Sequence, residues 1–342
     1  MRFSKRSALP AALVALTLVL AGCGGGDDDK PKGEDSSSAK PTPEKPAVWP
    51  LTGLPVAEGQ SDVLNHPPLV AKIPNNEHAA PQTGLSKADL VVEELVEGGT
   101  TRLAAFYYSQ LPKADVGPIR SMRASDIGIV SPVGGVMVTS GAAGQTIARL
   151  NRAGVKFVQE GRAQGFRRDS SRPESVYSVM ANLRAIAKDY GDKLDKAPAP
   201  YFTFGSDADM PQGEPAGTLS AGFGSRTSSW VFRGGKYVNT NGFAPKNDQF
   251  PADSVLVLRV NVVDAGYRDP AGNFVPESKF VGKGNAQLFH GGQVVAGTWS
   301  KAKPSSPLTL STGSGELKMP AGKTWVELVP VNGKGGSVTY GK

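Results

Sequence analysis

Residues 81–123, PQTGLSKADLVVEELVEGGTTRLAAFYYSQLPKADVGPIRSMR, decide how the rest of the chain is interpreted. Two apolar runs, 90–96 and 103–108, flank the sequence Glu97-Gly98-Gly99-Thr100. β-Branched and aromatic residues favour strands, and a Gly-Gly pair accepts the positive φ angles of a tight hairpin turn. The stretch therefore predicts a β-hairpin.

The turn length sets which side chains of this hairpin share a face. If Gly98 and Gly99 form a two-residue loop, Glu93 faces Ala104 across the strands. Glu93, Glu97 and Arg102 then lie on one face, because side chains alternate along a strand. Both glutamates are diagonal to Arg102, at roughly 7–8 Å between backbones, which long side chains can bridge.

More arginines follow the hairpin, on two loops. Residues 117–123 add Arg120 and Arg123, and residues 166–174 hold three arginines within six positions. The guanidinium fork suits bidentate recognition of carboxylate or phosphate groups. An ion-paired sheet face beside a basic loop is the structural alternative, because ion pairs that only stabilise a fold also cluster charges. The predicted ligand-binding residues are Glu93, Glu97, Arg102, Arg120, Arg123, Arg168, Asp169 and Arg172.

Residues 1–22 are predicted to be a lipoprotein signal peptide. Three basic residues open the chain, and residues 8–20 form an apolar run of signal-peptide length that is too short to span a bilayer comfortably. The sequence Leu20-Ala21-Gly22-Cys23 resembles a bacterial lipobox, in which the cysteine is lipidated and becomes the first mature residue. Cys23 is the only cysteine, which excludes an intrachain disulfide, a thiol nucleophile and a cysteine metal site.

The mature chain is only mildly basic. Removal of the signal peptide leaves 35 basic and 31 acidic residues, a net charge of +4, so we expect no nucleic-acid partner. Residues 24–48 are rich in Gly, Ser, Pro and charge, and together with Cys23 they predict a disordered tether over 23–48. His66 and His78 are twelve positions apart with no third ligand nearby, so neither a metal nor a cofactor is expected.

The folded part divides into two predicted halves, an N-terminal α/β domain over 49–196 and a β-rich C-terminal domain over 197–342. In the first, the glycine turn 140–146 between a strand and a helix has the layout of a phosphate loop but lacks its lysine, which excludes nucleotide hydrolysis. Apolar residues over 176–187 follow the helical period and predict a helix. In the second half, turn residues recur about every dozen positions, which indicates antiparallel sheet.

The order of these motifs resembles the YerB-like family of bacterial lipoproteins, over about residues 49–330. In the first half the resemblance rests on Pro81-Gln82-x-Gly84-Leu85, Ala88-Asp89, Glu93, Glu97-Gly98-Gly99-x-Thr101-Arg102, Gly117-Pro118-x-Arg120-Ser121-x-Arg123 and Phe166-Arg167-Arg168-Asp169-Ser170-Ser171-Arg172. In the second half it rests on Asn261-Val262-Val263, Gly282-x-Gly284, the turn 289–292, Gly297-x-Trp299-x-Lys301 and Gly322-x-Thr324-Trp325. The resemblance implies an α+β fold, a layered three-layer β/β/α sandwich with a β-rich C-terminal half, but no reaction. This chain has Pro173-Glu174-Ser175 where the family pattern runs to Pro-His-Asn.

These observations predict a lipid-anchored, extracytoplasmic binding or scaffold protein of the bacterial cell envelope. Diacylglycerol and palmitate on Cys23 would hold it on the cell membrane, and a pocket of arginine and glutamate side chains would take an anionic ligand or protein partner. No catalytic residue is assigned. The alternative is a cell-wall hydrolase with Glu93 and Glu97 as acid/base pair, since glycoside cleavage needs two carboxyl groups about 5–9.5 Å apart. A third interpretation is that these charges only hold the two halves together.

Overall fold

The computed structural model describes residues 47–190, 194–331 and 335–342. The predicted signal peptide, Cys23 and the tether up to residue 46 lie outside these ranges. Within them, no helix has both the length and the hydrophobicity that a membrane crossing requires.

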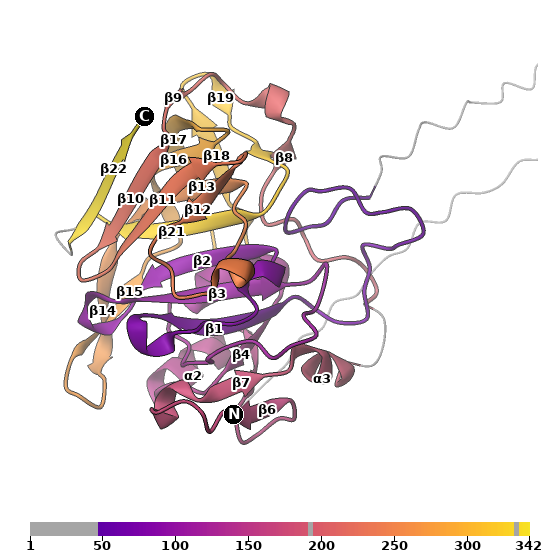
Figure 1. Cartoon of the computed structure of the whole chain (residues 1–342), viewed down its shortest axis with the longest axis vertical. Coiled ribbons are helices and arrows are strands. Elements are labelled where there is room, and N and C mark those ends of the chain that lie inside the picture. The colour runs from indigo at the N-terminus through magenta and orange to yellow at the C-terminus, as the bar shows by residue number, and fades with distance from the viewer. Residues whose placement is uncertain (1–46, 191–193, 332–334) are drawn as a thin grey trace, which may run out of the picture. The chain divides into compact units, whose positions relative to one another are not determined.

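One large mixed sheet joins the two halves of the chain (Figure 1). From edge to edge its strands are β19 (Gly315–Glu316), β18 (Thr309–Thr312), β17 (Gln293–Lys301), β16 (Gly282–His290), β13 (Ser254–Val260), β21 (Thr324–Pro330), β2 (Leu90–Leu95), β3 (Thr101–Tyr107), β1 (Leu69–Asn75), β4 (Val136–Thr139) and β5 (Lys156–Gln159). The short strand β9 (Glu214–Pro215) pairs with β17. Strand β21, from the C-terminal half, pairs in parallel with β2 from the N-terminal half, and we call this pair the seam. The sheet therefore continues across the predicted domain boundary.

The protein has three layers, with the large sheet in the middle and one apolar core on each of its faces. A four-stranded sheet, ordered β12 (Lys236–Asn239), β11 (Thr227–Arg233), β10 (Thr218–Phe223) and β22 (Gly336–Gly341), packs on one face. There Trp230 of β11 shares a core with Trp325 of β21. On the other face lie α1 (Asp126–Val130) and α2 (Gly144–Arg152), where Leu150 shares the second core with Val92 and Leu256. The predicted α+β fold with a layered β/β/α arrangement is confirmed, and strands buried on both faces explain the continuous apolar runs.

Shorter elements border these layers. They are α3 (Leu183–Lys188), the pairs β6 (Phe166–Arg168) with β7 (Val179–Ala181), β14 (Val262–Arg268) with β15 (Phe274–Ser278) and β8 (Phe204–Gly205) with β20 (Met319–Pro320), and the 3₁₀ turns η1 (Glu77–Ala79), η2 (Leu85–Lys87), η3 (Glu97–Gly99), η4 (Ser131–Val133), η5 (Ser175–Tyr177), η6 (Asp207–Asp209) and η7 (Lys246–Asp248). The helix predicted over 176–187 is wrong in its first half, where η5 and β7 precede α3. The backbone of β7 pairs with β6, and this tertiary pairing outweighs the local helical period.

The predicted hairpin forms, but its register differs by one residue. Glu97 to Gly99 make a 3₁₀ turn instead of a two-residue loop, and the Val96 N–H donates to Thr100 O at 2.9 Å. Glu93 consequently pairs with Leu103, and Glu94 pairs with Arg102. A shift of one residue moves a side chain to the opposite face, so Arg102 shares its face with Glu94 and not with Glu93.

Candidate functional site

Glu97 and Arg123 form the best-defined ion pair among the predicted site residues. The Arg123 guanidinium donates from Nε to Glu97 Oε1 and from Nη2 to Oε2, each at 2.7 Å. The pair is almost enclosed, with side chains 11% and 10% exposed. Burial opposes the charge of Glu97, but the hydrogen bonds and charge of Arg123, with the charge of Arg102, outweigh it and lower the pKa of Glu97. Glu97 is therefore a carboxylate already committed to an arginine.

Arg102 and Arg120 lie close enough to this pair to interact with it electrostatically. Arg102 is only 6% exposed and donates from Nη1 to Ser121 O at 2.7 Å. Burial, then the charge of Arg123 and the smaller effect of Arg120, lower the pKa of Arg102 to about 9, so its guanidinium is charged at neutral pH. We call these three arginines, with Glu97, the arginine cluster.

The loop that carries Arg120 is hydrogen-bonded to β1 and to the residue that follows β4, just beyond the point where these two strands pair. The Arg120 N–H donates to Lys72 O of β1 at 2.8 Å, and its carbonyl accepts from the N–H of Ser140, after β4, at 3.3 Å. Its guanidinium donates to Val176 O at 3.0 Å and lies 5.1 Å from the centre of the Tyr177 ring. Several hydrogen bonds of the cluster therefore go to the protein's own carbonyl groups.

The second arginine stretch meets the first at the turn η5. Arg168 donates to Glu160 at 2.7 and 3.0 Å and to Ser175 O at 2.8 Å, next to the carbonyl that Arg120 binds. Arg172 binds Pro81 O at 2.6 Å, and its buried Nε has no hydrogen-bond partner among the described residues. Asp169 accepts from the Ser171 hydroxyl at 2.7 Å and lies 3.7 Å from Arg172.

Glu93 lies apart from the cluster, on the other face of the sheet. Its side chain is fully buried and accepts hydrogen bonds from Asn75 at 2.9 Å and Thr101 at 2.6 Å. Beside it lies Glu327 of β21, a residue that the sequence interpretation missed. A buried Glu93 and an ion-paired Glu97 do not form an acid/base pair that a polymer could reach, so no observation favours the hydrolase alternative.

A buried ion triad, also missed from the sequence, lies on the same face as Arg102. Lys72 Nζ is 2.7 Å from Glu94 Oε1 and 2.9 Å from Asp126 Oδ1, and the side chains of all three residues are fully buried. The one available signal is a lysine inside the apolar strand β1, since a buried cation requires a counter-charge. Burial, opposed by Lys72 and reinforced by Asp126, raises the pKa of Glu94.

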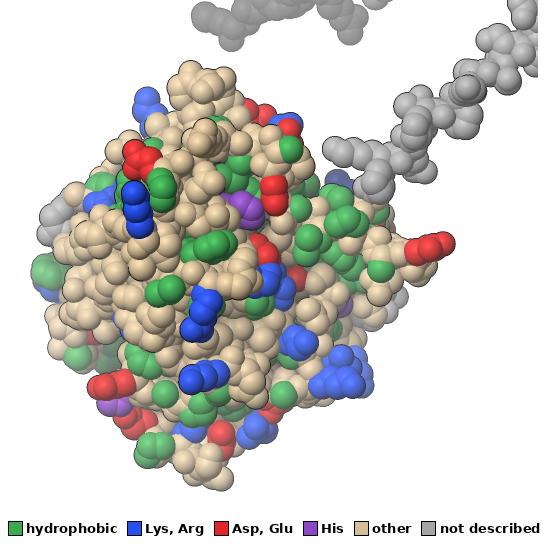
Figure 2. All heavy atoms as spheres, turned by 45° about the horizontal axis from the view of Figure 1, so that its top comes forward, with side chains coloured by type: hydrophobic (Ala, Val, Ile, Leu, Met, Phe, Trp, Pro, Cys, Tyr) green, Lys and Arg blue, Asp and Glu red, His purple; other side chains and the backbone are tan. Residues whose placement is uncertain are grey.

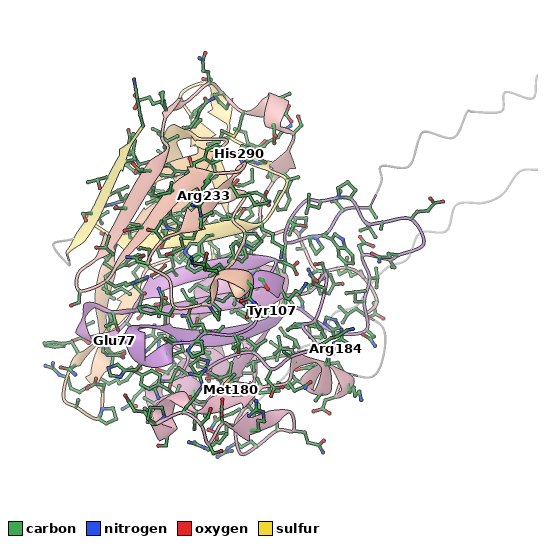
Figure 3. All side chains as sticks on the ribbon, in the orientation of Figure 1. Glu77, Tyr107, Met180, Arg184, Arg233 and His290 are labelled. Carbon is green, nitrogen blue, oxygen red and sulfur yellow. The ribbon has the colours of Figure 1, made fainter. Side chains whose placement is uncertain are left out.

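A surface groove of about 660 Å³ runs along the region where η2, the loop 110–115, β6 and α3 approach one another. Figure 3 labels two of its residues, Met180 and Arg184. Its basic residues are Lys87, Lys113, Arg167, Arg172 and Arg184, and its acidic residues are Asp115, Asp169 and Asp248. We call it the cationic groove. On the face shown in Figure 2, basic side chains are interspersed with acidic and apolar ones, so no broad basic surface is visible there.

The described part of the chain brings together no three His, Cys, Asp or Glu side chains that could hold a metal ion. The polar side chains that line the cationic groove include guanidinium, ammonium and carboxylate groups. Their chemistry is that of anion and cation pairing.

Comparison with protein families identifies the class to which the chain belongs. "Protein of unknown function (DUF3048) N-terminal domain" matches residues 51–194, and "Protein of unknown function (DUF3048) C-terminal domain" matches residues 220–326. The chain belongs to this family.

Particular relatives agree with this membership. The chain is 26% identical over 302 residues to "Putative lipoprotein YerB" of Bacillus subtilis (strain 168), a match that covers 85% of this chain and 89% of the relative. The crystal structure of YerB protein from Bacillus subtilis matches with a TM-score of 0.69 at 21% identity, over 86% of this chain and 99% of that chain. The resemblance identified from the sequence motifs is confirmed, and the structural match shows a shared fold.

Proposed function

We propose that the protein is a non-enzymatic binding lipoprotein, anchored on the extracytoplasmic face of the cell membrane, that holds an anionic ligand or protein partner in the cationic groove. The observation that carries this proposal is the unequal use of charges in the groove. Its three carboxylates are engaged by the protein, whereas several of its basic groups are not. The name of the relative YerB supports the lipoprotein part of the proposal.

The acidic residues of the groove are occupied by local donors. Asp248 accepts from the Gly84 N–H at 2.6 Å and from the Ser86 hydroxyl at 2.5 Å. Asp115 accepts from Arg167 at 2.5 Å and from Asn182 at 3.2 Å. Asp169, as described above, accepts from the Ser171 hydroxyl. These hydrogen bonds hold the three carboxylates in place, and because five basic residues line the groove against three acidic ones, the groove keeps a formal net charge of +2.

The basic residues of the groove provide hydrogen-bond donors that could bind an anion. Lys87 and Lys113 are exposed, and their ammonium groups make no hydrogen bond or ion pair to any other described residue. Arg172 is already used by the fold, because its terminal nitrogens donate to Ala79 O and Pro81 O and its buried Nε lies 3.7 Å from Asp169 Oδ2. In the described part of the chain, Arg184 donates only to Leu111 O, at 3.3 and 3.1 Å. A carboxylate or phosphate group in the groove would complete these donors.

The groove is tested by charge reversal with a matched control. We expect Lys87→Glu/Lys113→Glu to weaken binding of poly-L-glutamate and of polyphosphate at low salt by on the order of tenfold, since each reversal changes a surface interaction by about 1 kcal/mol. The control Lys156→Glu/Lys283→Glu changes the net charge equally at exposed positions outside the groove. Fluorescence anisotropy measures the affinities, and circular dichroism checks that the fold is unchanged. Equal losses in both variants would show attraction by net charge alone and would contradict the groove assignment.

The anchor is tested at Cys23, which precedes the residues that the structure describes. We expect Cys23→Ser to move the protein from the membrane fraction to the soluble or secreted fraction, because each buried acyl CH₂ group contributes about 0.8 kcal/mol to membrane binding. Protease treatment of intact spheroplasts then reports the face on which the wild-type protein lies. Retention of the serine variant in membranes, or full protection of the wild type, would contradict the proposed anchorage.

A further inference from the structure

Two buried glutamates meet at the seam between the halves of the protein. Glu93 of β2 and Glu327 of β21 are register partners on adjacent parallel strands, and each is 0% exposed. Among the described residues, neither carboxyl group has a basic partner within ion-pair distance. Two negative charges side by side in an apolar core would repel each other and would lose their hydration.

The hydrogen-bond donors around the two carboxyl groups are divided unequally. Besides Asn75 and Thr101, Glu93 accepts from the Ser228 hydroxyl at 2.9–3.0 Å and from Trp325 Nε1 at 3.2 Å. These donors, all neutral, come from four strands and could solvate a carboxylate. The surroundings of Glu93 are therefore those of an anion.

Glu327 has a different environment. Its Oε1 accepts a hydrogen bond from Trp230 Nε1 at 2.9 Å, whereas no described donor is hydrogen-bonded to its buried Oε2. The Trp230 and Trp325 rings pack edge to face on this side, with centroids 5.0 Å apart, and both side chains are buried. A proton on Oε2 would give that oxygen a hydrogen bond to donate, and the neighbouring Glu93 is the acceptor. Burial, followed by the charge of Glu93 and its hydrogen bond, raises the pKa of Glu327 well above its usual range.

We propose that Glu93 and Glu327 hold one proton between them, that Glu327 donates it to the Glu93 carboxylate, and that this proton is a structural link between the two halves of the protein. Among the described residues, Glu93 is the one titratable group that acts on the Glu327 carboxyl. Strand β13 places Val257 beside it, β11 contributes Trp230, and β2 contributes Glu93. The link does not depend on the groove, so either proposal can fail alone.

A raised pKa in the folded state has a defined effect on stability. In the unfolded chain Glu327 loses its proton near its ordinary pKa, about 4.3, whereas in the folded state it keeps it. Between these two values the folded state binds one more proton, so folding becomes less favourable as pH rises. The unfolding equilibrium constant should increase tenfold per pH unit from this group alone, until the folded-state pKa is reached.

The experiment compares the pH dependence of stability in the wild type and Glu327→Gln. Urea denaturation of the full chain is monitored by tryptophan fluorescence between pH 5 and pH 9. The slope of the unfolding free energy against pH should differ between the two proteins by the equivalent of one bound proton. The glutamine amide in Glu327→Gln can donate a hydrogen bond to Glu93 without binding a proton from solution. The ratio of the wild-type unfolding equilibrium constant to that of the variant should therefore increase tenfold per pH unit. Glu316→Gln, at an exposed position, should keep the wild-type slope. Equal slopes in Glu327→Gln and the wild type would overturn the proposal.

A second measurement does not depend on the folding of a variant. Infrared difference spectra of the folded wild type at neutral pH should contain the carbonyl stretch of a protonated carboxylic acid that does not exchange freely with solvent. Absence of this band at neutral pH would overturn the proposal even if Glu327→Gln could not be purified. Its presence, with loss in Glu327→Gln where that variant folds, assigns the proton to this pair.

Discussion

Replacement of Lys72 by methionine is expected to lower the free energy of unfolding by about 3–5 kcal/mol, the usual cost of removing one partner from a buried ion pair. Lys72 is the only described cation within ion-pair distance of Glu94 and Asp126, at 2.7 and 2.9 Å. Methionine fills a similar volume, so the change removes charge with little loss of packing. Urea denaturation at neutral pH measures the loss.

The Lys279–Glu277 pair is the matched control. Its atoms are 2.9 Å apart, as in the buried triad, but the lysine side chain is 47% exposed. Because exposed ion pairs contribute about 0–1 kcal/mol, Lys279→Met should have a small effect. The Lys72→Met variant should also regain stability as pH falls, since the pKa of Glu94 is already raised in the folded state and a protonated Glu94 no longer needs Lys72. Similar losses of unfolding free energy in both lysine variants would contradict the assignment of the triad as a buried ion cluster.

The sequence was sufficient to predict the hairpin and the layered fold, but not the register of the hairpin. Apolar runs on both sides of Gly98-Gly99 indicate strands, because local composition determines strand propensity. The register depends on the 3₁₀ turn at 97–99, whose length is coupled to contacts with another part of the chain: the N–H of Ser225 donates to Gly99 O at 3.0 Å. Local sequence contains no information on such a contact.

The lack of information on long-range contacts also explains which predicted site residues lie close together in the structure and which do not. Glu97, Arg102 and Arg123 lie within one short segment around the hairpin and its following loop, and the structure brings them together. Glu93 instead faces Glu327, which is more than two hundred positions away. Lys72 and Glu327 would each have been recognised by a simple physical signal, a charged residue inside an apolar strand, but the partner that makes the charge tolerable is set by tertiary pairing.

Replacement of Glu97 by glutamine is the second change with a large expected effect, a loss of about 3 kcal/mol in the free energy of unfolding. Among the described residues, Glu97 is the only carboxylate hydrogen-bonded to an arginine of the cluster, and its removal leaves Arg102, Arg120 and Arg123 as three neighbouring positive charges. Arg123→Met should cost less, because it removes one of the three like charges and Glu97 retains the favourable charge of Arg102. Urea denaturation of both single variants and the double variant measures the coupling energy.

The pH dependence separates charge from hydrogen bonding in this prediction. The folded-state pKa of Glu97 is lowered, so its contribution is present above its unfolded pKa of about 4.3 and is lost as pH falls through the lower folded value. Glu97→Gln should therefore be most destabilised at neutral pH and should approach the wild type in acid. High salt should restore part of the loss at neutral pH, because it screens repulsion among arginines that are not completely buried. A loss that is the same at every pH and salt concentration would instead assign the stabilisation to the shape of the bidentate contact, and the three arginines would then tolerate one another without a counter-charge.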